Sequence, residues 1–379
     1  MRSFFRIMSV LVSFLLVSLV VCGAGDKENI SGKSYVLMEA DTCTVIEGSE
    51  YSRRLKVGAL SKLMSILLIA EDIDSGEYTV NDILTASDSV TGTKGSVIWL
   101  ESGDKLSVDE LLKSVIVGNS NDALTILAER SAGDIGTFIA DMNARAFDLG
   151  LKDTYFESPY GYSGEATYSS AYDIAVICAE LLKHDFLTHY FRIWRDFVKN
   201  GQVELVNENE LVRTYGSHIG FKACHSDECG YCIAEAARGD DGTAFIAVIL
   251  GDNEAESCFK SSKKLLKKAF NGYKLSLTMF PDEMLAPLRV KNGTESAVEI
   301  CIRRQGKAVV PVGSSELRTK VVIPEYISAP VREGQAVGTA AFYNGDNLVF
   351  EADIITKSPV QGLQLPYVIG CLLFKLIEK

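Results

Sequence analysis

The hydrophobic pattern of this chain changes at Pro281, and that change limits the folds that the chain can adopt. Before Pro281, several segments repeat apolar residues with the period of a helix, and short apolar strands lie between them. After Pro281, short alternating runs are separated by Gly, Pro and Asn, which is typical of small all-β domains. The sequence therefore predicts an α+β domain over residues 30–275 and a β-rich domain over residues 281–357.

The elements of the first domain can be placed from their periods. We expect strands at Ser34–Met38, Thr44–Ile46, Ala234–Ala237 and Ala244–Leu250, and helices at Ala59–Ala70, Leu111–Glu129, Ile135–Leu149, Ser170–Lys183 and Ser261–Phe270. The segment Ala59–Ala70 is apolar almost all round, so its helix should be buried. In the second domain, the alternating runs are Ala297–Arg303, Lys320–Ile323 and Asn347–Ile355.

Both ends of the chain predict contact with a membrane. Arg2 and Arg6 flank the start of an apolar stretch over residues 7–21, and small residues follow it, so residues 1–24 are typical of a secretory signal. Residues 360–379 are dense in apolar side chains but fall short of a comfortable bilayer span, which favours a tail that lies on the membrane surface. The alternatives are a retained anchor at the start and a helix packed on the β domain at the end.

The net charge of the chain limits the kinds of partner that it can bind. The net charge is -12 and the pI is about 5.0, whereas a nucleic-acid partner needs a basic face. We therefore expect no nucleic-acid partner, and the predicted signal implies export across the cytoplasmic membrane to its outer face.

Stretches spread over nearly the whole chain resemble the low-molecular-mass penicillin-binding proteins that act as D-alanyl-D-alanine carboxypeptidases, the S11 serine peptidases. They are Tyr35–Thr42, Leu60–Ser65, Asn121–Ala123, Leu149–Lys152, Phe156–Pro159, Cys229–Cys232, Lys320–Pro324 and Gly334–Gly338. The resemblance implies a β-lactamase/DD-peptidase-like α+β fold, an antiparallel sheet packed with a helical cluster, and then a small all-β domain. It also implies a role in peptidoglycan metabolism, no cofactor, and a stem peptide ending in D-Ala-D-Ala as the substrate.

The family's first motif, Ser-x-x-Lys, sets a serine nucleophile three residues before a lysine, so that both lie on one helical face. Here the lysine is Lys62, in the position of the general base, and Ala59 stands in the nucleophile position. A methyl group cannot attack a carbonyl. Ser61 is two residues from Ala59, roughly 200° around a helix, so its hydroxyl should point away.

The other two motifs also depart from the family pattern. In Ser-x-Asn, the serine relays protons and the asparagine binds the substrate amide; here Asn119 takes the relay position and Asn121 is kept. In Lys-Thr-Gly, the lysine and threonine hold the substrate carboxylate; here the strand reads Lys222, Ala223 and Cys224. Each change removes a polar group or adds a side chain in one cleft, so we expect that the fold is kept and the acyl transfer is lost.

The cysteines give a separate hypothesis. Cys224, Cys229 and Cys232 lie within nine residues, with His225 between them and His218 upstream, which is enough to ligate zinc. Since the other cysteines are scattered, we interpret most of them as buried apolar residues and expect neither a metal nor a disulfide framework.

Three functions remain open at this point. The first is a catalytically silent homologue that binds stem peptides or a wall partner through Lys62, Asn121 and Lys222. The second is an active carboxypeptidase with a substituted nucleophile such as Ser61. The third is a structural spacer whose cleft is closed by Cys224.

Overall fold

The computed structural model describes residues 30–162, 166–278, 280–304, 306–314 and 317–363. The predicted signal at residues 1–24 and most of the predicted tail at 360–379 therefore lie outside the described residues. Within the described ranges, no helix is both long enough and apolar enough to cross a bilayer. The chain divides into two compact units, residues 1–271 and 272–379.

The first unit is built on a six-stranded sheet with the order β2-β1-β10-β9-β7, and β8 also pairs with β9. The strands are β1 (Ser34–Glu39), β2 (Thr44–Ser49), β7 (His218–Gly220), β8 (Ala223–Ser226), β9 (Gly230–Arg238) and β10 (Ala244–Asp252). Every pairing in this sheet is antiparallel. All nine residues of β10 are buried, which fits a central strand covered on both faces.

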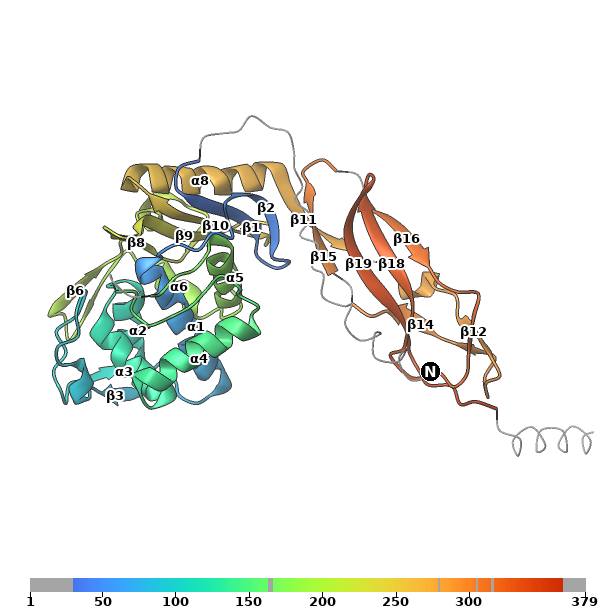
Figure 1. The fold of residues 1–379 in the computed structure, drawn as a ribbon, viewed down its shortest axis with the longest axis horizontal. Helices are drawn as coiled ribbons and strands as arrows, with labels where there is room; N and C mark the ends of the chain where they lie inside the picture. Colours follow the sequence, from blue (N-terminus) through green and yellow to red (C-terminus); the bar gives the residue numbers. More distant parts are fainter. Residues whose placement is uncertain (1–29, 163–165, 279, 305, 315–316, 364–379) are drawn as a thin grey trace, which may run out of the picture. The chain divides into compact units, whose positions relative to one another are not determined.

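Helices cover the two faces of this sheet (Figure 1). They are α1 (Lys62–Ser75), α2 (Val108–Ile116), α3 (Asn121–Ala132), α4 (Ile135–Asp148), α5 (Ala171–Leu181), α6 (Leu187–Phe191), α7 (Leu211–Thr214) and α8 (Ala255–Gly272). Helix α8 runs along one face, where Phe270 meets Phe245 of β10 with ring centroids 5.1 Å apart. The helical cluster that contains α1 to α5 lies on the other face, and α1 and α5 pack in one core with it.

Short elements complete the first unit. These are η1 (Gly58–Ser61), η2 (Asp88–Val90), the hairpin β3 (Ile83–Thr85) with β4 (Lys105–Ser107), and the hairpin β5 (Arg195–Val198) with β6 (Val203–Val206). The buried helix expected from Ala59 begins as η1 and continues as α1, whose first six residues are all buried. The α+β architecture predicted from the sequence is therefore correct.

One predicted helix is wrong. The period over Leu111–Glu129 predicted a single helix, but α2 ends at Ile116 and α3 begins at Asn121. The backbone turns at Asn119, whose φ is 58°, a left-handed conformation that asparagine tolerates better than most residues. Apolar periodicity does not register this break because both helices bury their apolar faces in the same core.

Among its described residues, the second unit is all-β apart from one short turn of helix, η3 (Asp282–Met284). Its strands are β11 (Tyr273–Thr278), β12 (Leu288–Lys291), β13 (Ala297–Val298), β14 (Ile300–Ile302), β15 (Gly306–Pro311), β16 (Arg318–Val322), β17 (Tyr326–Ser328), β18 (Ala336–Asn344) and β19 (Asn347–Thr356). They form sheets of four, three and two strands around an apolar core of their own. A β-rich domain that follows the α+β domain is confirmed, and its first strand, β11, begins at Tyr273, before Pro281.

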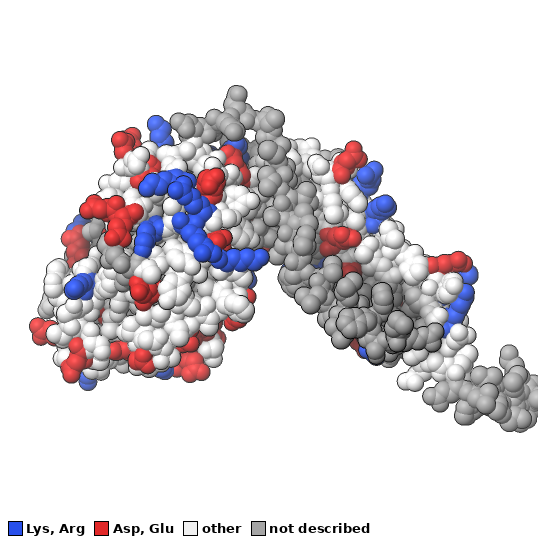
Figure 2. Space-filling model, viewed as in Figure 1, with Lys and Arg blue, Asp and Glu red and all other residues white. Residues whose placement is uncertain are grey.

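Charge is mixed on the surface (Figure 2). On the face of the first unit that is shown, basic side chains form a line across the upper half, and acidic side chains gather along the lower edge.

Candidate functional site

Lys62 is the first residue of α1, and Ala59 lies one turn earlier in η1. Gly58, at the start of η1, has φ of 52°, which a residue without Cβ adopts at little cost. The Lys62 side chain is only 1% exposed, so its charge is held inside the protein. The sequence thus brings a methyl group and a buried amine together at one helix start.

The amine of Lys62 contacts the turn between α2 and α3. Its Nζ donates to Oδ1 of Asn119 at 2.8 Å and also to the Asn119 carbonyl. Burial of the amine, and then the nearby positive charge of Lys222, hold the pKa of Lys62 well below its usual value. A larger neutral fraction is what a general base needs, but the group that faces this amine is an amide, which does not exchange a proton with a base near neutral pH.

The turn that carries Asn119 is fixed by Asp122. The Asp122 carboxylate accepts from the backbone N–H groups of Ile98 and Leu100 at 3.0–3.1 Å, and the Ser120 hydroxyl donates to it. Ser120 is fully buried and is held by this bond, so it faces the carboxylate rather than an open cleft. The structure therefore gives Ser120 a structural partner of its own.

Asn121 begins α3 directly after this turn. Its Nδ2 donates to the Lys94 carbonyl at 2.6 Å, while its buried Oδ1 has no hydrogen-bond partner. A buried acceptor without a partner costs free energy and suits a site that awaits a donor.

Lys222 connects the sheet to the same turn. It lies between β7 and β8, is buried, and donates from Nζ to the carbonyls of Val115 and Ile116 at 3.1 and 3.2 Å. These carbonyls end α2, where unpaired acceptors attract a cation. Burial lowers the pKa of Lys222 to about 8. The ammonium has three donors, and these two bonds use two of them.

Ala223 and Cys224 follow Lys222 on β8, and both are buried. The Cys224 thiol donates to the Val57 carbonyl at 3.4 Å. Its sulfur would lie 3.4 Å from a Cβ built on Gly58. The third candidate motif therefore packs directly against the segment that leads into Ala59.

The seven predicted site residues come from three separate parts of the chain and share one region. Lys62 contacts Asn119, Lys222 acts on Lys62 by charge, and Cys224 contacts the start of η1. Ala223 and Asn121 adjoin these residues in sequence. The region unites the start of α1, the α2–α3 turn and the β8 strand.

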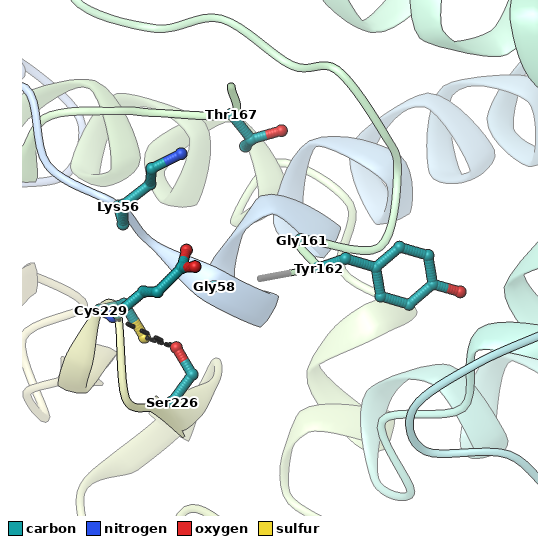
Figure 3. Close-up of a pocket in the computed structure, with 8 residues that line it drawn as sticks. Lys56, Gly58, Gly161, Tyr162, Thr167, Ser226 and Cys229 are labelled. Carbon is teal, nitrogen blue, oxygen red and sulfur yellow. Dashed lines mark hydrogen bonds between the residues drawn. The ribbon is translucent and has the colours of Figure 1, made fainter. Parts of the chain in front are cut away.

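A pocket lies beside this region (Figure 3). Its lining is Lys56, Gly58, Gly161, Tyr162, Thr167, Ser226, Glu228 and Cys229. None of these residues was a predicted site residue. Gly58 and Gly161 both have a positive φ, and their backbones approach each other closely. A Cβ on Gly161 would lie 2.0 Å from the carbonyl oxygen of Gly58, so this position requires glycine.

The histidines that a zinc site would need have other partners. His218 bonds to Glu235 through Nδ1 at 2.5 Å, and the His225 ring stacks on Tyr231. Among the described residues, no group of His, Cys, Asp or Glu is arranged to hold a metal ion. The seven described cysteines are free thiols, and five of them are buried.

Comparison with known families places the chain. Residues 23–254, more than half of the sequence, match the model of D-alanyl-D-alanine carboxypeptidase, peptidase S11. The chain belongs to the D-alanyl-D-alanine carboxypeptidase family. Residues 273–361 match the C-terminal domain of penicillin-binding protein 5, which accords with the separate β unit of this family member.

Similar proteins span almost the same length as this carboxypeptidase-family chain. The D-alanyl-D-alanine carboxypeptidase DacF of Bacillus subtilis is 30% identical over 334 residues, 87% of this chain and 86% of the relative. The carboxypeptidase DacC of Escherichia coli is 27% identical over 88% of this chain and 86% of its own. Among solved structures, penicillin binding protein 5 from Haemophilus influenzae superposes with a TM-score of 0.81 at 23% identity, over 88% of this chain and 98% of that one.

Proposed function

We propose that this chain is a catalytically inactive member of the D-alanyl-D-alanine carboxypeptidase family that binds peptidoglycan stem peptides ending in D-Ala-D-Ala, or a partner in the cell wall. The observation that carries the proposal is the pairing at the start of α1. Ala59 stands three residues before Lys62, and the Lys62 amine donates to Asn119 instead of facing a serine hydroxyl. Loss of a serine nucleophile alone costs on the order of 10^6-fold in rate.

The polar groups that remain support peptide binding. Oδ1 of Asn121 has no partner, and Lys222 keeps one donor beyond the two that reach α2. A peptide N–H would supply the donor for the Asn121 oxygen, and a terminal carboxylate would supply the acceptor for Lys222. Ala223 offers no hydroxyl to the carboxylate, so this binding is expected to be weak.

The alternative is an active carboxypeptidase that uses Ser61. The Ser61 hydroxyl is buried and has no hydrogen-bond partner, and a Cβ on Gly161 would lie 2.6 Å from it. A nucleophile needs a base within hydrogen-bond reach and an open path to the substrate. Gly161 covers the path, and this observation favours the inactive homologue.

Location is part of the same proposal. We infer that residues 1–24 direct export and that the two domains span residues 30–275 and 281–357. We also infer that residues 360–379 attach the chain to the outer face of the cytoplasmic membrane. Relatives named as D-alanyl-D-alanine carboxypeptidases support a place in the cell wall.

Two measurements test the proposal. The purified chain, incubated with a fluorescent penicillin and resolved on a denaturing gel, should carry no covalent label. Titration of a peptide ending in D-Ala-D-Ala, followed by NMR, should shift resonances saturably, and the L-Ala-L-Ala peptide should not. Labelling of the wild-type chain would establish the active alternative, and equal behaviour of the two peptides would leave only the structural spacer.

A binding variant sharpens the second measurement. Asn121→Ala removes the unpartnered oxygen and should abolish the difference between the two peptides. Asn143→Ala is a control, because Asn143 also bridges backbone groups, those of Ile139 and Phe156, yet belongs to α4 and not to the candidate site. A loss of discrimination in both variants would point to a general disturbance of the fold.

A further inference from the structure

Three thiols gather at the β8–β9 hairpin beside the candidate site. Cys224 of β8 and Cys232 of β9 are directly opposite each other in the antiparallel ladder, and Cys229 lies in the connection between the strands. All three are buried free thiols, and the sulfurs of Cys229 and Cys224 lie 3.0 and 3.4 Å from the same point beside Gly58. Cys224 is the last residue of the third candidate motif, whereas Cys229 and Cys232 belong to none of the three motifs.

Cys229 is chemically distinct from its neighbours. The Ser226 hydroxyl donates to the Cys229 sulfur at 3.0 Å. Interactions with the neighbouring thiols, first Cys224 and then Cys232, hold the pKa of Cys229 below its usual value. The interaction with Cys229, together with burial, raises the pKa of Cys224 instead. Of these two thiols, Cys229 is therefore the one that loses its proton more readily.

Cys229 is also the cysteine that lines the pocket of Figure 3. Its sulfur lies against Gly58, at 3.0 Å from the place where a Cβ would stand, and Gly161 forms the facing wall. At both glycines the surrounding atoms pack too closely for a side chain. Lys56 and Glu228 place opposite charges in the same lining.

Cys224 is the neighbour best placed to react with Cys229. Its sulfur approaches the same point beside Gly58, at 3.4 Å. The Cys232 sulfur is turned to the backbone, where it donates to the Cys229 carbonyl and accepts from the N–H of Gly251 at 3.4–3.5 Å. Cys224 and Cys229 therefore share one side of the cluster.

We propose that Cys229 is a covalent modification site for small disulfides that enter the pocket, with Cys224 as the resolving thiol. The Cys229 thiolate attacks one sulfur of the disulfide, which forms a mixed disulfide and releases one small thiolate. The Cys224 thiol then loses its proton and attacks the Cys229 sulfur. This second step forms the Cys224–Cys229 disulfide and releases the second small thiol, so the small disulfide is reduced by two electrons and the protein is oxidised by two.

The test uses the folded chain and oxidised glutathione as the probe. Intact mass spectrometry over time should show a transient gain of one glutathionyl group and then a loss of two hydrogens relative to the reduced chain. Peptide mapping should place the new bond between Cys224 and Cys229. In the Cys224→Ala variant the reaction should stop at the mixed disulfide on Cys229.

Controls separate this site from ordinary thiol exchange. Cys229→Ala should slow the first step at least about tenfold, since the rate follows the thiolate fraction and access. Cys301→Ala, which removes a half-buried thiol of the second unit, should leave it unchanged. Reaction of Cys229→Ala at the wild-type rate, or no reaction of a wild-type chain whose circular dichroism shows it folded, would overturn the proposal. The outcome does not depend on peptide binding, so the two proposals can fail separately.

Discussion

The amine of Lys62 donates to the side-chain oxygen of Asn119 at 2.8 Å, across 57 residues of sequence. This bond joins the start of α1 to the turn between α2 and α3. It occupies the Asn119 oxygen, an acceptor to which the hydroxyl of a catalytic serine could otherwise donate. The predictions below follow from this bond and from the groups around it.

Ala59→Ser should restore covalent reaction with penicillin. The variant places a hydroxyl three residues before Lys62, whose lowered pKa favours the neutral amine that a base requires. Labelling by a fluorescent penicillin should rise by several orders of magnitude over wild type, because nucleophile loss costs on the order of 10^6-fold. The double variant Ala59→Ser with Ser61→Ala should label equally well. A folded Ala59→Ser chain that takes no label would show that position 59 is not the nucleophile position.

Asn119→Ala should destabilise the first unit by about 2–3 kcal/mol, because it strains a left-handed backbone and removes an acceptor from a buried amine. Urea unfolding followed by circular dichroism measures the change. Asn119→Gly relieves the backbone strain but still lacks the acceptor, so its loss should be smaller. Equal stabilities of the two variants would mean that the φ of 58° carries no strain.

Lys222 should make stability depend on pH above about 8. Its pKa is about 8 in the folded protein and about 10.4 in an unfolded chain, so the unfolded state binds more protons between these values. Stability of wild type relative to Lys222→Met should therefore increase with pH across that window, by at most about 1.4 kcal/mol per pH unit. Below pH 8 both states are protonated and the difference should be flat. A difference that falls with pH would place the folded pKa above the unfolded one.

Gly161→Ala should unfold or strongly destabilise the first unit, by about 3 kcal/mol or more, since its Cβ would stand 2.0 Å from the carbonyl oxygen of Gly58. Gly150→Ala is the matched control. Gly150 has φ of 72°, close to the 75° of Gly161, but nothing lies within 4 Å of its would-be Cβ. It should lose only about 1 kcal/mol, from the left-handed backbone. Thermal unfolding of both variants measures the two losses, and equal losses would contradict the close approach between Gly161 and Gly58.

The cysteine hypothesis shows what spacing alone can miss. Cys224, Cys229, Cys232 and the two histidines have spacings that suit zinc, yet His218 pairs with Glu235 and His225 stacks on Tyr231. Side-chain direction is set by which face of the sheet a residue occupies, and that depends on register. The β8–β9 register brings Cys224 opposite Cys232, so the sulfurs face one another instead of a metal with histidine.

The sequence by itself determined the two fold classes, because the helical and strand periods of apolar residues are local and can be read from the linear sequence. Its short motifs also pointed to Lys62, Asn119, Asn121 and Lys222. Only the tertiary structure decided what these groups do. The helix break at Asn119, the burial of both amines and the free oxygen of Asn121 arise from contacts between residues far apart in sequence. Desolvation and hydrogen bonding depend on those neighbours, and a linear pattern does not contain them.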